Sequence, residues 1–177
     1  VQRRISRRMG LTAFAAAIIG SFDALMAASP PSKSFFLTSG SASVVPPTSA
    51  FVLARCRIDG SDLYLISANN EPDYLPSVMQ DGRVLYTRWE YNDRSALFNH
   101  PLIAMNPDGT AQTEYYGNNS MFPSSIIHAH GIPGSQKVIA LIAGHHSIYK
   151  GKLGLIDRTQ GLWAGQGIEF VNTKLDG

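Results

Sequence analysis

The sequence contains a single cysteine, Cys56, among its 177 residues. One cysteine excludes an intrachain disulfide framework, a four-cysteine zinc site and a C-x-x-C-H motif for covalent haem attachment. Charged residues make up 16% of the chain, below the roughly 25% that is usual in soluble domains. Four of the 15 basic residues lie within the first eight positions, which leaves 11 basic against 13 acidic residues. The rest of the chain is therefore close to neutral, and we expect no nucleic-acid partner.

Residues 1–30 have the order of a secretory signal peptide. Arginines precede an apolar run (Leu11–Ile19), and small residues follow, as in the charged, apolar and cleavage regions of such a signal. A retained membrane anchor is the less favoured alternative, because the run is shorter than the roughly 20 residues that cross a bilayer. Asp23 would also lie inside any longer span. Arg7-Arg8 resembles a twin-arginine signal. We expect a bacterial, periplasmic or otherwise exported protein that meets the membrane only transiently.

The remainder of the chain divides into a linker and one domain. Residues 31–50 are rich in Ser and Pro, which is typical of a linker. Beyond them the sequence repeats itself: Asp59-Gly60-Ser61 recurs as Asp108-Gly109-Thr110, 49 residues later. Asp-Gly pairs favour tight hairpins, and the segments between them are apolar runs of strand length. Such a period is typical of propeller blades. Residues 51–177 are therefore predicted to form an all-β fold, a partial β-propeller of about two four-stranded antiparallel blades.

The expected strands can be placed along the repeat. The first blade uses strands near Ser77–Met79, Val84–Arg88, Leu102–Asn106 and Thr113–Tyr116. The second blade uses strands near Ser125–Ala129, Val138–Ala143, Leu153–Asp157 and Ile168–Val171. The segment Phe51–Ile66 would supply strands of a preceding, incomplete blade. Propellers close with about four to eight blades. We therefore expect the chain to be a fragment whose partners are the missing blades or partner subunits of a larger propeller.

The stretch Ala68–Tyr91 resembles the middle domain of the hydrazine synthase alpha subunit, a domain also found in large exported planctomycete-type proteins. The Asp-Gly turns alone are shared with TolB-type and WD-type propellers, whereas the sequence Leu-Tyr-Thr-Arg-Trp-Glu-Tyr at positions 85–91 is more specific. The resemblance covers about Ile58–Gly161. It continues through Met105–Thr110, Tyr116–Asn119, Ile132–Ser135 and His145–Ser147.

The resemblance implies a β-propeller in an exported protein. The family's enzyme makes hydrazine within a multisubunit assembly that carries c-type haems. Because Cys56 stands alone, no cofactor is expected in this chain, and haem c or zinc is expected only in a full-length parent. The leading hypothesis is a non-catalytic scaffold or binding portion of such a propeller. The alternatives are a fragment of a metal- or haem-dependent redox enzyme that lacks its haem domains, and a TolB-like propeller that binds a protein or cell-wall partner.

Histidines are the candidate metal ligands, and no catalytic residue is identified. His128 and His130 are expected on one face of a strand because side chains alternate. His145 and His146 follow a strand, where propeller loops commonly carry function. Together they offer imidazole nitrogens to zinc or copper; the alternative is that they hydrogen-bond the backbone at strand ends. The resemblance adds Tyr149, which with His145 would correspond to the family's tyrosine-ligated haem with zinc nearby.

Two polar segments have both a binding and a structural interpretation. Trp89–Arg94 follows a strand, and its three charged residues would surround a ligand. The favoured alternative is a structural corner in which Trp89 is buried between blades. Glu71 and Asp73 flank Pro72 and would act as a carboxylate pair or, as the turn composition favours, brace the turn.

Overall fold

The computed structural model describes the backbone of residues 34–39 and the chain from 51 to 171, except positions 70, 91–98, 146, 148 and 149. The predicted signal peptide, residues 1–30, lies outside the described residues. No helix within the described ranges has the length and apolarity that a membrane span requires. Apart from the 3-10 turn η1 (Arg158–Gln160), the regular structure in these ranges consists of strands.

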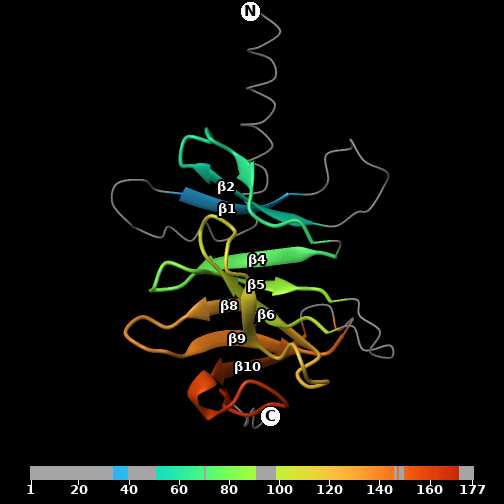
Figure 1. Cartoon of the computed structure of the whole chain (residues 1–177). Coiled ribbons are helices and arrows are strands. Elements are labelled where there is room, and N and C mark those ends of the chain that lie inside the picture. Colours follow the sequence, from blue (N-terminus) through green and yellow to red (C-terminus); the bar gives the residue numbers. More distant parts are fainter. Residues whose placement is uncertain are drawn as a thin grey trace, which may run out of the picture.

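Three antiparallel sheets lie one above another and form the body of the molecule (Figure 1). In each sheet the strands are neighbours in chain order, so each sheet is a simple meander. We name the sheets blade 1, blade 2 and blade 3. Blade 1 comprises β1 (Ser34–Ser39), β2 (Val52–Arg57) and β3 (Tyr64–Leu65). Blade 2 comprises β4 (Asp73–Val78), β5 (Val84–Arg88), β6 (Leu102–Met105) and β7 (Thr113–Tyr116). Blade 3 comprises β8 (Ser125–Gly131), β9 (Val138–Ala143), β10 (Gly151–Ile156) and β11 (Ile168–Phe170).

The two four-stranded blades confirm the predicted all-β fold and partial propeller, and their strands overlap the expected ranges. The first strand differs most, because β4 begins at Asp73 instead of near Ser77. The structure differs in the range 31–50, which the sequence composition assigns to a linker. Part of that range forms β1, whose backbone pairs with β2 in register from Ser34↔Arg57 to Ser39↔Val52. The sequence of β1, S-F-F-L-T-S, is an apolar run of strand length, and the Ser and Pro residues around it conceal this in the composition. The preceding, incomplete blade thus has three strands.

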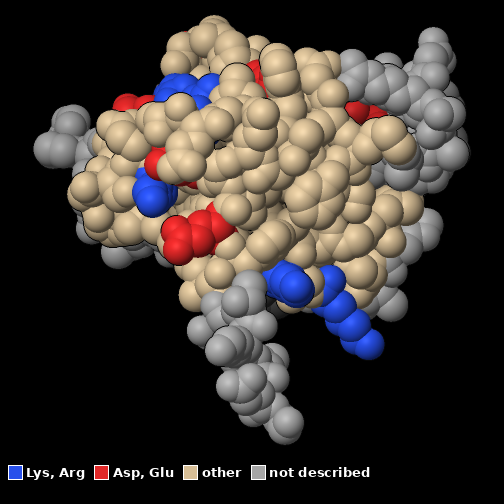
Figure 2. All heavy atoms as spheres, turned by 90° about the horizontal axis from the view of Figure 1, so that it is seen from below, with Lys and Arg blue, Asp and Glu red and all other residues tan. Residues whose placement is uncertain are grey.

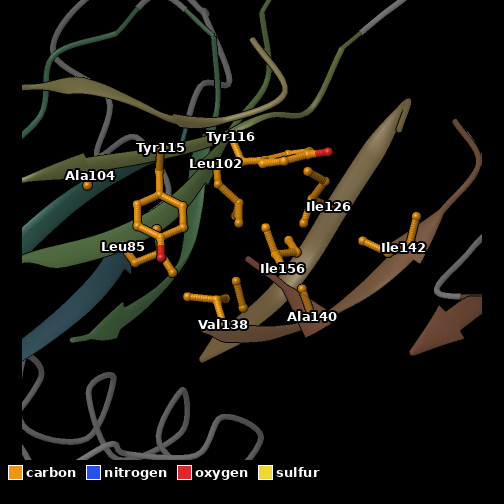
Figure 3. Packing of buried hydrophobic residues seen from close by; sticks show 11 residues of the cluster. Leu85, Leu102, Ala104, Tyr115, Tyr116, Ile126, Val138, Ala140, Ile142 and Ile156 are labelled. Atoms are coloured by element: carbon orange, nitrogen blue, oxygen red, sulfur yellow. The ribbon is translucent and has the colours of Figure 1, made fainter. Parts of the chain in front are cut away.

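Blade 2 lies between the other two blades, and its central strands are buried on both faces. Every residue of β6 is buried, as are the first four residues of β5, as expected for a sheet covered on each side. One face packs on blade 1 in a cluster that includes Leu53, Val84 and Met105. The other face packs on blade 3, where side chains from the two sheets point toward one another (Figure 3). This second cluster joins Leu85, Leu102, Ala104, Tyr115 and Tyr116 of blade 2 to Ile126, Ala129, Val138, Ala140, Ile142 and Ile156 of blade 3.

A turn built around an aspartate recurs three times. In each copy the Oδ1 atom of the aspartate accepts the backbone N–H and the hydroxyl of the residue two positions later. The copies are Asp59–Ser61, Asp108–Thr110 and Asp157–Thr159, spaced 49 residues apart. The third copy escapes notice in the sequence because Arg158 replaces the glycine, and here the chain continues into η1. The repeat therefore extends through blade 3.

These turns are expected to make the stability of the protein fall on acidification. The hydroxyl and N–H bonds hold the pKa of Asp59, Asp108 and Asp157 below the ordinary value of 3.8. A lowered pKa in the folded state stabilises the fold above the unfolded value, and that contribution is lost as the pH falls through the folded value. Urea denaturation between pH 6 and about pH 2 should show less loss in the triple Asp→Asn variant than in the wild type. Equal losses in both proteins would contradict the assignment.

Gly109 allows close approach between blades 1 and 2. It has a φ of +88°, and an added β-carbon would overlap the carbonyl oxygen of Ile66. Gly82 occupies another Asp-Gly turn with a φ of +84° and has open space around it. We expect Gly109→Ala to lower the free energy of unfolding by about 1–3 kcal/mol more than Gly82→Ala, because only the former forces the backbones apart. Similar losses in urea denaturation of the two variants would show that backbone conformation alone matters.

The loop between β10 and β11 fastens blade 3 to the outer strand of blade 2. The N–H of Gly117 donates to the carbonyl oxygen of Leu162 at 2.9 Å, and the indole N–H of Trp163 donates to Glu114 at 2.8 Å. The hydroxyl of Tyr116 donates to the carbonyl oxygen of Gln166 at 2.6 Å. We refer to residues 157–167 as the brace loop. It joins blades 2 and 3 outside the apolar cluster between them.

Candidate functional site

Four ring side chains gather at one end of the strands of blades 2 and 3. Tyr74 belongs to β4, Trp89 follows β5, His100 precedes β6, and His145 follows β9. The end of β5 and the start of β6 are neighbours in the meander, and β9 of the next blade ends on the same side of the stack. We refer to these four residues as the ring cluster. Residues far apart in the sequence meet here because equivalent loops of successive blades emerge side by side.

The rings contact one another closely. The centroids of Trp89 and His100 are 5.1 Å apart with an interplanar angle of 21°, which is a stacked arrangement. The His145 ring lies 5.5 Å from His100 and 6.2 Å from Trp89, centroid to centroid. The Tyr74 hydroxyl is hydrogen-bonded to Nδ1 of His100. All four side chains are partly buried, so the cluster combines aromatic faces with imidazole nitrogens at the edge of a rigid sheet.

An ion pair supports the strands that carry Tyr74 and Trp89. Nε and an Nη atom of Arg88 donate to the two carboxylate oxygens of Asp73 at 2.7 and 3.0 Å. The Asp73 side chain is fully buried, and that of Arg88 is 14% exposed. Asp73 and Arg88 are directly opposite each other in the register of β4 and β5. The bidentate bond therefore holds the strand ends from which two of the four rings project.

The same environment fixes the protonation states beside the cluster. Burial opposes the charged form of Arg88, but the hydrogen bond and charge of Asp73 outweigh it and raise the pKa of the guanidinium. Burial also raises the pKa of the Tyr86 hydroxyl, which accepts a hydrogen bond from Arg88 at 2.9 Å. Arg88 stays charged and Tyr86 stays neutral near neutral pH, so both serve as fixed hydrogen-bonding groups rather than as proton carriers.

His100 links the two blades through its backbone. Its N–H donates to the carbonyl oxygen of Ser124, and its carbonyl oxygen accepts the N–H of Ile126, both at 3.0 Å. The neighbouring Asn99 is buried, and its side-chain amide donates to the carbonyl oxygen of Gly117 at 2.6 Å. These bonds set the position of the imidazole relative to both blades. The ring cluster is thus a feature of the interface between blades and not of one loop.

The structure separates His128 and His130 from His145. His130 is opposite Ile139, whereas Ala143, close to His145, is opposite Ser125. His128 is exposed, has a φ of +51° and lies in a β-bulge, which breaks the strand alternation assumed for it. Within the described ranges, no three His, Cys, Asp or Glu residues are placed to hold one metal ion. His146 and Tyr149 lie outside those ranges, so the pairing of His145 with Tyr149 stays a prediction.

The described parts of the two polar segments contact other residues of blade 2 and the ring cluster. Trp89 is partly buried in the ring cluster, and the N–H of Glu90 donates to the carbonyl oxygen of Asn99 at 3.0 Å. The other charged residues of that segment lie outside the described ranges. Asp73 is bound to Arg88 and does not form a carboxylate pair with Glu71, whose backbone carbonyl oxygen accepts the Asn69 amide at 3.0 Å.

Sequence reasoning identified Trp89 and His145 but gave no role to Tyr74 or His100. His100 directly precedes the predicted strand at Leu102, and Trp89 directly follows the strand ending at Arg88. Strands that are neighbours in a meander bring the end of one to the start of the next. That rule alone would have placed His100 beside Trp89. The contribution of His145 required the register between the blades.

Comparisons with known proteins show the fold and leave the family open. No family model matches the chain, and no curated protein does. Among solved structures, a protein described as TolB from Agrobacterium tumefaciens matches with a TM-score of 0.55 and 13% identity, over 77% of this chain and 44% of that chain. Hydrazine synthase from Kuenenia stuttgartiensis matches with a TM-score of 0.61 and 14% identity, over 80% of this chain and 22% of that chain. The chain therefore has a propeller-type fold and spans less than half of either matched chain.

Proposed function

We propose that the chain is a scaffold and binding portion of an exported β-propeller protein, and that it contacts its ligand through the ring cluster. The observation that carries this proposal is the meeting of four ring side chains from two blades at one end of the strands. Loops that emerge from a rigid sheet are the usual place for binding residues in such folds. The ion pair beneath the cluster supplies the required rigidity.

The chemistry of the cluster favours binding over catalysis. Stacked and edge-on rings offer flat apolar surface together with hydrogen-bonding nitrogens, which suits a partner that inserts a ring or an apolar side chain. Two charged groups next to Tyr74 and Trp89, Asp73 and Arg88, are bound to each other. A protein partner of the kind expected for a TolB-like propeller would use these features without any chemical step.

A redox enzyme fragment is the second candidate, and one observation favours it. His145, which the resemblance pairs with Tyr149 at a haem, lies 5.5 Å from His100 between ring centroids. Two imidazoles at this separation are close enough to share one metal ion. On this proposal the haem or metal domains belong to a longer parent protein, and this chain contributes one wall of the site.

Site-specific photocrosslinking tests the binding proposal. A photoreactive amino acid replaces His145 in one protein and Ser135 in a control, since Ser135 is exposed in the turn between β8 and β9, at the other end of the strands. We expect a defined adduct in periplasmic extract of the producing bacterium from position 145 and none from position 135. Equal labelling from both positions, or none from either, would count against a binding role of the cluster.

Calorimetric titration separates the second candidate from the first. Zinc chloride and hemin are titrated into the wild-type protein and into His100→Ala and His145→Ala variants. Stoichiometric uptake that both substitutions weaken at least tenfold would favour the redox enzyme fragment. Uptake that neither substitution alters would place any metal or haem elsewhere and leave the binding proposal to the crosslinking result.

A further inference from the structure

Blade 3 carries a second apolar face, directed away from blade 2. In β9 and β10 the residues Val138, Ala140 and Ile156 belong to the cluster shared with blade 2. The residues that alternate with them therefore point to the other side of the sheet. They form two directly opposed cross-strand pairs, Ile139↔Leu155 and Leu141↔Leu153. We refer to these four aliphatic residues as the outer face of blade 3.

The register shows what this face is equivalent to in blade 2. β5 begins at Val84, which is paired with Met105 at the end of β6. In the same way, β9 begins at Val138, which is paired with Ile156 at the end of β10. Aligning these pairs assigns each residue of the outer face to a counterpart in blade 2. The counterparts of Ile139, Leu141, Leu153 and Leu155 are Leu85, Thr87, Leu102 and Ala104, respectively.

All four counterparts contact the next blade. Leu85, Leu102 and Ala104 are buried in the cluster between blades 2 and 3. The hydroxyl of Thr87 donates to the carbonyl oxygen of Ile126 in β8 at 2.8 Å. The outer face of blade 3 thus repeats, position by position, the surface through which blade 2 holds blade 3, and it continues an interface that already exists within the molecule.

On the outer face itself these positions keep part of their surface exposed. Leu153 is 42% exposed, and Ile139, Leu141 and Leu155 are each partly exposed. Figure 2 looks onto the end of the stack that blade 3 forms, and most of the described surface in that view is uncharged. A contiguous aliphatic face of this kind is typical of an interaction surface rather than of surface left to solvent.

We propose that the outer face of blade 3 docks a further four-stranded antiparallel blade of the same repeat, packed as blade 3 packs on blade 2. The contact at this face is more apolar than the existing one, because Leu141 replaces the hydroxyl of Thr87. The first strand of the docked blade, which corresponds to β8, therefore needs no carbonyl oxygen to accept a hydrogen bond at that point. This inference is independent of the proposed role of the ring cluster.

Thiol labelling at the outer face tests the proposal. Leu153→Cys is introduced with Cys56→Ser, since Cys56 is the one native cysteine and is buried. The labelling rate with a maleimide is compared between the full chain and the full chain extended after Gly177 by a second copy of residues 117–171. A matched cysteine at Ser135, in an exposed turn, controls for general changes in accessibility.

We expect the extension to slow labelling at position 153 at least tenfold and to leave position 135 unchanged. A second pair of proteins, with and without the extension, carries Leu141→Thr and Leu155→Ala. These substitutions give the outer face the side chains of Thr87 and Ala104, with which blade 2 contacts blade 3. Slowing in either pair supports the docking of a blade. Unchanged labelling in both pairs overturns the proposal, and so does sedimentation showing that the unextended chain covers position 153 by forming a dimer.

Discussion

Replacing Asp73 with alanine is expected to lower the free energy of unfolding by about 3–5 kcal/mol, the usual result of removing one partner from a buried ion pair. The Asp73 side chain has no exposed surface, and Arg88 donates two hydrogen bonds to it. Without the carboxylate, the guanidinium keeps its bonds to Tyr86 and Gln112, but its charge loses its hydrogen-bonded counterion in a mostly buried position. Urea denaturation followed by circular dichroism measures the change.

Asp81→Ala is the matched control for this prediction. Asp81 also accepts a bond from an arginine Nε, that of Arg83, at 2.8 Å, but the two side chains are 48% and 36% exposed, respectively. Exposed pairs contribute about 0–1 kcal/mol, so this variant should unfold close to the wild type. The double variant Asp73→Leu/Arg88→Met should recover part of the loss, because it removes both charges together. A loss for Asp73→Ala as small as that for Asp81→Ala would contradict a stabilising role of the buried pair.

Leu102→Ala is expected to destabilise the protein by about 2–5 kcal/mol, because it removes buried methyl groups and leaves a cavity. Leu102 is fully buried in the cluster between blades 2 and 3, and Figure 3 shows it beside Tyr116. The loss of stability measures the contact between the blades, because the side chain of Leu102 lies in the cluster between blades 2 and 3. Urea denaturation gives the free energy, and loss of near-ultraviolet circular dichroism at low urea would show that the blades separate.

The control substitution is Leu65→Ala, which deletes the same atoms from a side chain that is 63% exposed in β3. A surface position of this kind usually changes stability by less than about 0.5 kcal/mol. If the two substitutions lowered the free energy of unfolding equally, the contact between blades 2 and 3 would not be a main source of stability.

The strands of blades 2 and 3 could be predicted from the sequence because local signals agree there. An Asp-Gly turn precedes the apolar run Val84–Arg88, a Pro-Gly turn precedes the run Val138–Ala143, and adjacent strands pair in chain order. β1 could not be predicted, because its apolar run is short and lies among Ser and Pro residues. Its pairing with β2 depends on a partner more than ten residues away along the chain.

Apart from the meeting of Trp89 with His100, the candidate site depends on contacts that no local signal contains. The Asp73–Arg88 pair joins residues 15 positions apart, and the sequence predicts only that Arg88 ends a strand. Tyr74 and His100 meet across 26 positions, and His145 joins them from the next blade. Register between strands decides these contacts, and a shift of one residue would place each side chain on the opposite face. Residue type alone therefore identified Trp89 and His145 without showing that they meet.

The brace loop has a consequence for how the chain folds. A stack of meanders can form largely from hairpins between sequence neighbours, which are quick to close. The brace adds contacts between residues 49 and 50 positions apart, Trp163 with Glu114 and Gln166 with Tyr116. Such long-range contacts raise the contact order and slow folding, because the chain loses loop entropy before the contacts form. If blade 3 unfolds, the outer strand of blade 2 loses these contacts and becomes exposed. We therefore expect blades 2 and 3 to unfold as one cooperative unit.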